Sequence, residues 1–170
     1  MNMHALTNSD GVPGISVVAD KHPCVRLRTI QCRDQNNLLR WRNANREWFF
    51  CSQLITLAEQ LAWFGAYRQR RDDYLFIVEV GGVGIGCMGI RLRETWDIYN
   101  IIRSDNIYSG GGYMGAGLEM MREFARWLRP LPVVALVFKA NPAMGWYYHN
   151  GFKCTEDGNK GDTWARLTYS

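Results

Sequence analysis

Hydrophobic and polar positions in the first part of the chain predict one strand followed by two helices. Alternation over residues 24–30 is typical of a half-exposed strand. The next segment, to about Arg46, has apolar residues at helical spacing and predicts a first helix. The sequence Thr56-Leu-Ala-Glu59 has the pattern of a capping box, in which the Thr hydroxyl and the Glu carboxylate each satisfy a backbone donor. We therefore expect a second helix from there to about residue 71.

From residue 72 the pattern changes to that of a β-meander. Residues 74–80 are rich in β-branched and aromatic side chains, which are typical of strands. Gly81-Gly82 has the composition of a two-residue hairpin turn. Residues 83–92 and 96–102 follow as two further strands, so a three-stranded meander is expected.

The remainder of the chain predicts a helix, a strand, a short helix and two closing strands. A polar loop ends in Gly110-Gly111-Gly112, and a helix with an apolar stripe follows it. Residues 133–138 form a short apolar run typical of a buried strand, and a short helix is expected between Asn141 and Asn150. This order predicts a single α/β domain over residues 23–170, built on one mixed sheet. Residues 1–22 are polar and contain Gly and Pro, so we expect them to form a flexible leader.

Charge and composition narrow the class of protein. The chain has 170 residues and a formal charge of +4, and 16 of its 20 basic residues are Arg. Arg suits bidentate contact with phosphate or carboxylate, and these residues are scattered rather than gathered in a basic run. We therefore expect an anionic small ligand rather than a nucleic acid. The longest apolar run, residues 131–138, is far short of the ~20 residues of a membrane helix, so no membrane partner is expected.

The five cysteines and three histidines predict neither a disulfide framework nor a metal site. The cysteines are odd in number, widely spaced and never in C-x-x-C, and the histidines lack the spacing of metal ligands. Any one cysteine has the chemistry of a nucleophile, but we favour buried, small apolar side chains in a reducing compartment. Because the first twenty residues do not form a secretory signal, we expect a soluble, cytoplasmic protein.

The glycine-rich segment from Gly110 to Gly115 predicts a phosphate site. It follows a strand and opens a helix, so its main-chain N–H groups and the positive end of the helix dipole face the same ligand. The segment also satisfies the dinucleotide pattern G-x-G-x-x-G. That interpretation fails because no Asp or Glu occurs between Glu123 and Glu156 to hold a ribose. No G-K-[ST] follows the glycines, which excludes a P-loop.

Four stretches carry a resemblance to a known family. They are LLRWRN at residues 38–43, WDIYNII at 96–102, GGGYM at 110–114, and Asn141-Pro-Ala143 followed by Tyr147-x-x-x-Gly151-Phe152. In this order they resemble the first helix, fourth strand, pyrophosphate loop and closing signature of the GNAT superfamily of acetyl-CoA-dependent N-acetyltransferases. The likeness is to the branch that acetylates amino sugars and protein N-termini. The loop departs from the family pattern at Ser109 and Met114.

The resemblance implies a fold, a co-substrate and the residues that hold it. The fold is a central, mixed, mostly antiparallel sheet with helices on both faces, which splays beside the strand at 96–102. The implied co-substrate is acetyl-CoA, without a metal. The implied binding residues are Ile101, Ile102, Arg103, Gly110, Gly111, Gly112, Tyr113, Met114, Asn141 and Tyr147.

The resemblance also assigns catalytic roles. Tyr147 would protonate the departing CoA sulfur; Tyr148 is the alternative, because the spacing from Asn141 to the Gly-Phe pair is one residue short of the family pattern. A main-chain N–H beside the splayed sheet would stabilise the carbonyl oxygen, a contribution of roughly 3 kcal/mol. Asp97 is the first candidate for collecting the proton of the amine, and Glu94 is the second.

Acceptor recognition is expected in the second helix and in the segment from Trp41 to Phe50. That segment combines aromatic faces with guanidinium groups, which suit a sugar or base bearing a phosphate or carboxylate. Its residues are Trp41, Arg42, Asn43, Arg46, Trp48 and Phe49. An equally weighted alternative is that the aromatics belong to the core.

The sequence therefore predicts an N-acetyltransferase that acts by direct attack in a ternary complex on the amine of a small polar acceptor. A phosphorylated or nucleotide-linked amino sugar is the first expectation for the acceptor, and a protein N-terminus is the second. A catalytically silent acyl-CoA-binding module of the same fold is the other interpretation. A monomer or homodimer is expected.

Overall fold

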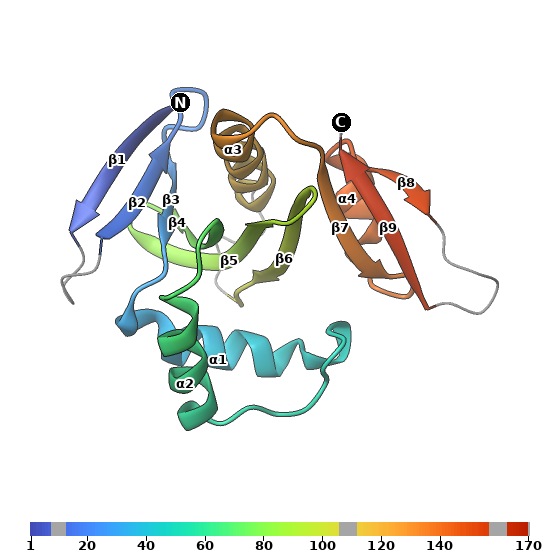
Figure 1. Cartoon of the computed structure of the whole chain (residues 1–170), viewed down its shortest axis with the longest axis horizontal. Helices are drawn as coiled ribbons and strands as arrows, with labels where there is room; N and C mark the ends of the chain where they lie inside the picture. Colours follow the sequence, from blue (N-terminus) through green and yellow to red (C-terminus); the bar gives the residue numbers. More distant parts are fainter. Residues whose placement is uncertain (8–12, 106–111, 157–162, 170) are drawn as a thin grey trace.

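The computed structural model describes residues 1–7, 13–105, 112–156 and 163–169. Within these ranges one nine-stranded sheet runs in the order β1-β2-β3-β4-β5-β6-β7-β9-β8 (Figure 1). The strands are β1 (Asn2–Thr7), β2 (Pro13–Val18), β3 (Val25–Thr29), β4 (Asp73–Val80), β5 (Val83–Leu92), β6 (Trp96–Arg103), β7 (Val133–Phe138), β8 (Lys153–Glu156) and β9 (Trp164–Tyr169). The helices are η1 (Cys32–Asp34), α1 (Gln35–Ala44), η2 (Arg46–Trp48), α2 (Leu57–Tyr67), α3 (Tyr113–Leu128) and α4 (Met144–His149).

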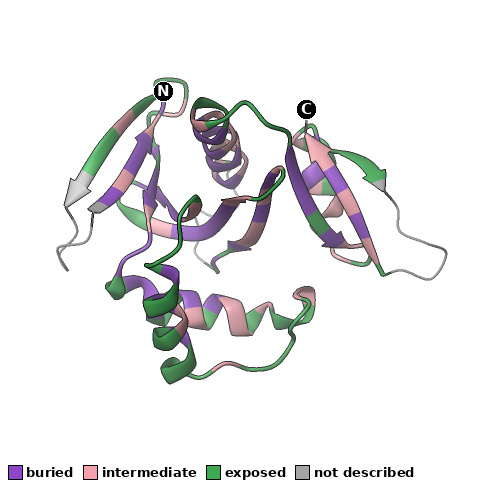
Figure 2. Cartoon of the chain, viewed as in Figure 1, coloured by how far each residue is buried: buried purple, intermediate pink, exposed green. Residues whose placement is uncertain are grey.

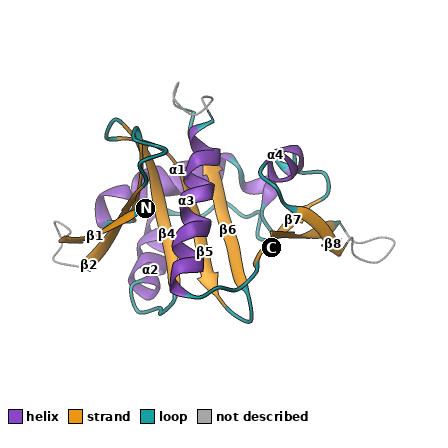
Figure 3. Ribbon diagram, turned by 90° about the horizontal axis from the view of Figure 1, so that it is seen from above, coloured by secondary structure: helices purple, strands orange, loops and turns teal. Residues whose placement is uncertain are grey.

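Helices cover both faces of the sheet, and each face has its own hydrophobic core. Helix α3 lies over β4, β5 and β6 on one face, and α1 and α2 lie on the other (Figure 3). The core under α3 and α4 includes Phe76, Trp96, Leu118, Phe124 and Tyr147. The core under α1 and α2 includes Leu38, Trp41, Phe64, Leu75 and Ile77. Figure 2 shows the buried residues concentrated on the central strands and on the inner side of α3. The predicted mixed, mostly antiparallel sheet with helices on both faces is confirmed.

The expectation of a flexible leader over residues 1–22 is wrong. Strands β1 and β2 form a hairpin there, and β2 pairs antiparallel with β3. The Ile15 N–H donates to Thr29 Oγ1 at 3.0 Å, and the Val17 side chain is fully buried. Local Gly and Pro signals favoured a loop, but β2 is stabilised by pairing with β3 and by packing under α3, neither of which is visible in a local window.

The helix starts were predicted better than the helix ends. The capping box is confirmed: the Glu59 N–H donates to Thr56 Oγ1 at 3.2 Å, and the Thr56 N–H donates to Glu59 Oε2 at 2.7 Å. However, α2 ends at Tyr67 rather than near residue 71, whereas α4 lies between Asn141 and Asn150 as predicted. No helix in the described ranges is long and apolar enough to cross a membrane.

The cysteine expectation holds only for Cys87, which is buried in the α1–α2 core. It is wrong for the other four, which are exposed: Cys24, Cys32, Cys51 and Cys154.

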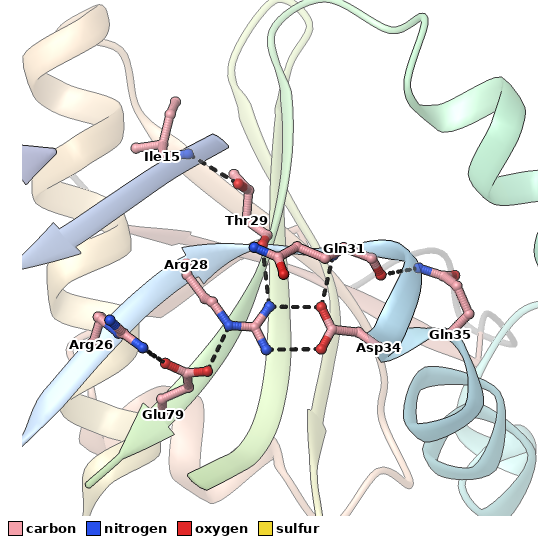
Figure 4. Close-up of polar contacts among 8 residues, drawn as sticks. All are labelled: Ile15, Arg26, Arg28, Thr29, Gln31, Asp34, Gln35 and Glu79. Atoms are coloured by element: carbon pink, nitrogen blue, oxygen red, sulfur yellow. Dashed lines mark hydrogen bonds and ion pairs between the residues drawn. The ribbon is translucent and has the colours of Figure 1, made fainter. Parts of the chain in front are cut away.

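A buried ionic network fixes the place where the chain leaves β3 and enters α1 (Figure 4). Arg28 donates from Nη1 and Nη2 to the two carboxylate oxygens of Asp34, at 2.7 and 2.8 Å, and from Nε to Glu79 at 2.6 Å. Arg26 pairs with the second oxygen of Glu79, and the Gln31 N–H donates to Asp34 at 2.7 Å. Buried charges are tolerated when they are paired and hydrogen-bonded in this way. The network therefore anchors the first turn of α1 to the sheet.

Candidate active site

The sheet opens between β6 and β7. Their parallel pairing covers only Trp96 with Val133, Asp97 with Val134, and Ile98 with Ala135. Beyond these pairs, β6 continues along β5 and β7 continues along β9, and Figure 1 shows the two strands separating. Each strand therefore presents an unpaired main-chain edge to the opening, and such groups require a partner.

A β-bulge lies in β6 at this opening. Tyr99 pairs with Gly89, and Ile102 pairs with Cys87, so Asn100 and Ile101 together lie opposite a single residue of β5. Asn100 has a φ of 50°, in the left-handed region, which Asn tolerates better than most side chains. Its carbonyl accepts a hydrogen bond from the Cys87 Sγ at 3.4 Å. Bulges redirect main-chain groups and are frequent next to active sites.

A cavity of about 330 Å³ lies between the bulge and helices α1 and α2. Most of its wall is apolar, and a few polar side chains are placed within that wall, as in small-molecule sites. The polar side chains are Arg42, Glu59, Gln60 and Asn100. The apolar side chains are Leu38, Ile55, Trp63, Leu75, Cys87 and Ile102.

The Arg42 guanidinium is held in place but is not neutralised. It lies 3.8 Å from the centroid of the Phe49 ring, and its Nη2 donates to the Cys51 carbonyl. Its Nη1 is buried and has no hydrogen-bond partner among the described residues. Desolvation lowers the pKa of Arg42 from its ordinary value, although an Arg this far above neutrality stays charged.

Glu59 supplies a carboxylate to the same cavity. Hydrogen bonds from the Thr56 backbone N–H and then from the Thr56 hydroxyl lower the pKa of Glu59 below its usual range. The carboxylate is therefore ionised at neutral pH. From the sequence, Glu59 is recognisable only as part of the helix cap, because nothing in the sequence shows that this helix start faces a cavity.

The start of α3 offers main-chain donors. Gly112 caps the helix with a φ of 75°, in the left-handed region that favours glycine, and the first intrahelical bond runs from the Ala116 N–H to its carbonyl at 3.1 Å. The N–H groups of Tyr113, Met114 and Gly115 precede that bond and have no intrahelical acceptor. A second cavity of about 510 Å³ lies beside them, between α3, α4 and β9. Gly110 and Gly111, predicted to take part in this site, lie outside the described residues.

The fold is similar to those of several solved acetyltransferases. A probable GNAT-family acetyltransferase from Chromobacterium violaceum superimposes with a TM-score of 0.70 at 13% identity, over 90% of this chain and 83% of that one. The ribosomal-protein-alanine N-acetyltransferase of Brucella melitensis gives 0.65 at 20%, over 84% and 96%. A nucleotide-linked sugar GNAT, FdhC in its apo form, gives 0.69 at 15%, over 86% of each chain. The chain has the GNAT fold. The sequence matches no protein-family model and no curated protein.

Within this GNAT fold, the predicted cofactor residues of β6 line the opening with their main chain. Ile101 packs toward the α3 core, the Ile102 side chain is buried in the α1–α2 core, and Arg103 is exposed. Their unpaired edge faces the gap toward β7. On the β7 side, Asn141 accepts a hydrogen bond at Oδ1 from the Ala143 N–H at 2.8 Å, which orders the entry into α4.

The two tyrosines that the sequence left open have different environments. Tyr147 is buried, with its ring packed edge-on against Trp146 and Phe152. Burial raises the pKa of its phenol well above the ordinary value, which keeps the proton on the oxygen. Tyr148 is 47% exposed. The raised pKa makes Tyr147 a weaker acid than a free tyrosine, so its role as proton donor rests on the resemblance and requires transfer in concert with cleavage of the carbon–sulfur bond.

The two predicted carboxylates do not line the 330 Å³ cavity. Asp97 forms ion pairs with Arg91 at 3.1 Å and Arg93 at 3.7 Å, in the part of β6 that pairs with β7. It lies three residues before Asn100, or ~10 Å along the strand. Glu94 is exposed in the turn between β5 and β6. Glu59 is the carboxylate that the structure places in the cavity.

Of the six predicted acceptor residues, only Arg42 lines the cavity. The others lie around it: Trp41 is buried in the core, Asn43 hydrogen-bonds both main-chain groups of Ile55, Arg46 is exposed, and Trp48 and Phe49 are half-buried. Trp41 therefore belongs to the core, as the alternative expected. Phe49 does not line the cavity but packs against the Arg42 guanidinium that does. The second helix was expected to take part, and α2 does contribute Glu59, Gln60 and Trp63 to the cavity wall. These three residues were not singled out in the sequence because they show only ordinary helical spacing.

Proposed function

We propose that this protein transfers an acetyl group from acetyl-CoA to a primary amine of a small polar acceptor. The observation that carries the proposal is the β6 bulge at Asn100, which lies where the β6–β7 opening meets a cavity of small-molecule size. The names of the GNAT-fold neighbours support the same class of reaction, since one is a ribosomal-protein-alanine N-acetyltransferase.

The described residues fit coenzyme A. The open edge of β6 at Ile101, Ile102 and Arg103 offers main-chain groups to an extended amide-bearing arm, much as an added strand would. The unpaired N–H groups at the start of α3 suit a diphosphate. The 510 Å³ cavity beside them leaves room for the remaining nucleotide part.

Acetyl-CoA supplies an acetyl thioester, whose carbonyl carbon is attacked by the neutral amine while the carbon–sulfur bond breaks. A main-chain N–H at the bulge stabilises the negative charge on the carbonyl oxygen, an effect of roughly 3 kcal/mol. Tyr147 donates its phenolic proton to the departing sulfur. Glu59, which lines the cavity, takes the proton from the amine directly or through one water. Asp97, the candidate expected from sequence, is held by two arginines and would have to act over a longer water chain.

The proposal is tested by titrating acetyl-CoA calorimetrically and then measuring release of free CoA thiol with a panel of amines. The panel includes free and phosphorylated hexosamines, a nucleotide-linked amino sugar and a peptide with a free N-terminus. We expect acetyl-CoA to bind and at least one amine to stimulate thiol release. Absence of binding at millimolar acetyl-CoA would refute the proposal. Binding without turnover of any amine would favour the silent module.

A further inference from the structure

The cavity below the bulge carries two opposite charges that do not neutralise each other. Arg42 comes from α1 and Glu59 from the first turn of α2, and both line the same 330 Å³ space. Among the described residues, no ion pair involves either of them. By contrast, the buried Arg28 is matched by Asp34 and Glu79. The buried Nη1 of Arg42 therefore calls for an anion, whereas the exposed Glu59 carboxylate is solvated and is available to a cation.

The anion-binding side of the cavity is the Arg42 guanidinium, whose position is fixed by two contacts. Phe49 lies under the guanidinium, and the Cys51 carbonyl accepts from Nη2, so the group has little freedom to turn toward bulk solvent. Its Nη1 remains buried and unpartnered among the described residues. A buried donor without an acceptor is costly, and it is more costly when the donor is charged. A carboxylate or phosphate in the cavity would satisfy the guanidinium with charge-assisted hydrogen bonds.

The cation-binding side of the cavity is the Glu59 carboxylate, which hydrogen bonds from Thr56 hold in place. Glu59 is ionised and held by Thr56, so it can accept hydrogen bonds from an ammonium without reorganising. The wall shared with these two charged groups is apolar, formed by Leu38, Trp63 and Leu75. A molecule with a short carbon skeleton between an amine and an anion matches this distribution.

We propose that the acceptor is an amine that also carries an anionic group, a carboxylate or a phosphate, which Arg42 binds while Glu59 faces the amine. This inference rests on the proposed function and names its substrate class. The volume, at the low end of the ~300–1,000 Å³ range of ligand pockets, sets the size of the part that enters. An amino acid or a hexosamine phosphate fits this description.

The test compares matched acceptors that differ only in the anion: glucosamine 6-phosphate against glucosamine, and β-alanine against propylamine. Wild type, Arg42→Gln, Arg42→Lys and the control Arg33→Gln are assayed for kcat/KM. Arg33 is exposed in η1 and lines neither cavity. In wild type and Arg33→Gln, we expect the anionic member of at least one pair to be preferred by tenfold or more. Arg42→Gln should abolish that preference, and Arg42→Lys should restore part of it. The pair that responds distinguishes a carboxylate from a phosphate.

A second measurement does not depend on finding the acceptor. Inorganic phosphate is titrated calorimetrically into the protein saturated with CoA, so that the α3 site is already filled. Phosphate binding should weaken at least tenfold in Arg42→Gln and stay unchanged in Arg33→Gln. If Arg42→Gln does not fold, as judged by thermal denaturation, Arg42→Lys is titrated in its place.

The two possible failures are distinguishable. If acetyl-CoA does not bind wild type, the proposed function itself fails. If acetyl-CoA binds but neutral and anionic amines are used equally, or phosphate binds Arg42→Gln as well as wild type, only the anionic acceptor is overturned. If no amine of the set is acetylated, the phosphate titration alone decides.

Discussion

Deleting Asn100 tests whether the bulge is the chemical centre of the molecule. The present pairing places Tyr99 opposite Gly89 and Ile102 opposite Cys87, with two residues of β6 facing one of β5. Removing Asn100 would leave Ile101 opposite Met88, and every other residue of β6 would keep its partner and its face. The deletion therefore converts a bulged ladder into a regular one without shifting the core.

The deletion is expected to leave stability nearly unchanged and to lower activity strongly. Asn100 has a φ of 50°, and a non-glycine residue in the left-handed region costs ~1–2 kcal/mol. The deletion relieves this strain and loses only the weak Cys87–Asn100 hydrogen bond, so the free energy of unfolding should change by less than about 1 kcal/mol. Loss of one preorganised oxyanion donor lowers kcat by roughly 10²–10³-fold.

The free energy of unfolding is measured by urea denaturation, and kcat is measured from CoA thiol release at saturating acetyl-CoA. Asn100→Gly is the matched control, because glycine adopts the same φ and keeps the bulge while removing the side chain. We expect this control to retain activity within about tenfold, since main-chain geometry is preserved. If the deletion variant folds with normal stability and keeps the turnover of Asn100→Gly, the reasoning that places the oxyanion donor at the bulge is wrong.

Four further outcomes follow from the same structure. Arg28→Met leaves the buried Asp34 without its cation and should lower the free energy of unfolding by about 3–5 kcal/mol in urea denaturation. Tyr147→Phe should reduce kcat by about 10²-fold without changing the calorimetric affinity for acetyl-CoA, since its buried phenol stays protonated. Glu59→Gln should lower kcat by about 10²-fold at neutral pH, where the lowered pKa of the wild-type carboxyl keeps it ionised and able to take the amine proton. Burial raises the pKa of the Cys87 thiol to about 12, so at pH 8 a thiol reagent should modify it only after unfolding, whereas the exposed cysteines react at once: Cys24, Cys32, Cys51 and Cys154.

The fold was predictable from sequence wherever local patterns and tertiary packing agree. The meander from residue 74 to 102 has β-branched strands and a Gly-Gly turn, and it forms as expected. The capping box at Thr56 is also formed. The β1–β2 hairpin was missed because a strand at the sheet edge is stabilised mainly by its neighbour, and no residue window contains that information.

The site was predictable only in part, for a similar reason. Main-chain binding at β6 depends on strand order, which the resemblance supplied, and the opening is present where it was expected. The side chains that line the cavity depend instead on how α1 and α2 cross the sheet. Asp97 had the right residue type on the right strand, but its ion pair with Arg91 and its place in the paired segment were not visible in sequence. The capping box fully explains Glu59 in the sequence, so its additional place on the cavity wall was not expected.

The charges of the cavity depend on contacts made away from it. The Arg28–Asp34 pair sets where α1 leaves the sheet, and the two hydrogen bonds between Asn43 and Ile55 set how the chain turns toward α2. Arg42 and Glu59 follow these two anchors in the chain, so their separation is fixed before any ligand arrives. A pair of this kind discriminates by the spacing of an anion and an amine rather than by charge alone, because a ligand must reach both groups at once. Acceptor choice in this protein should therefore be more sensitive to shifts of α1 against α2 than to substitutions on the CoA side of the opening.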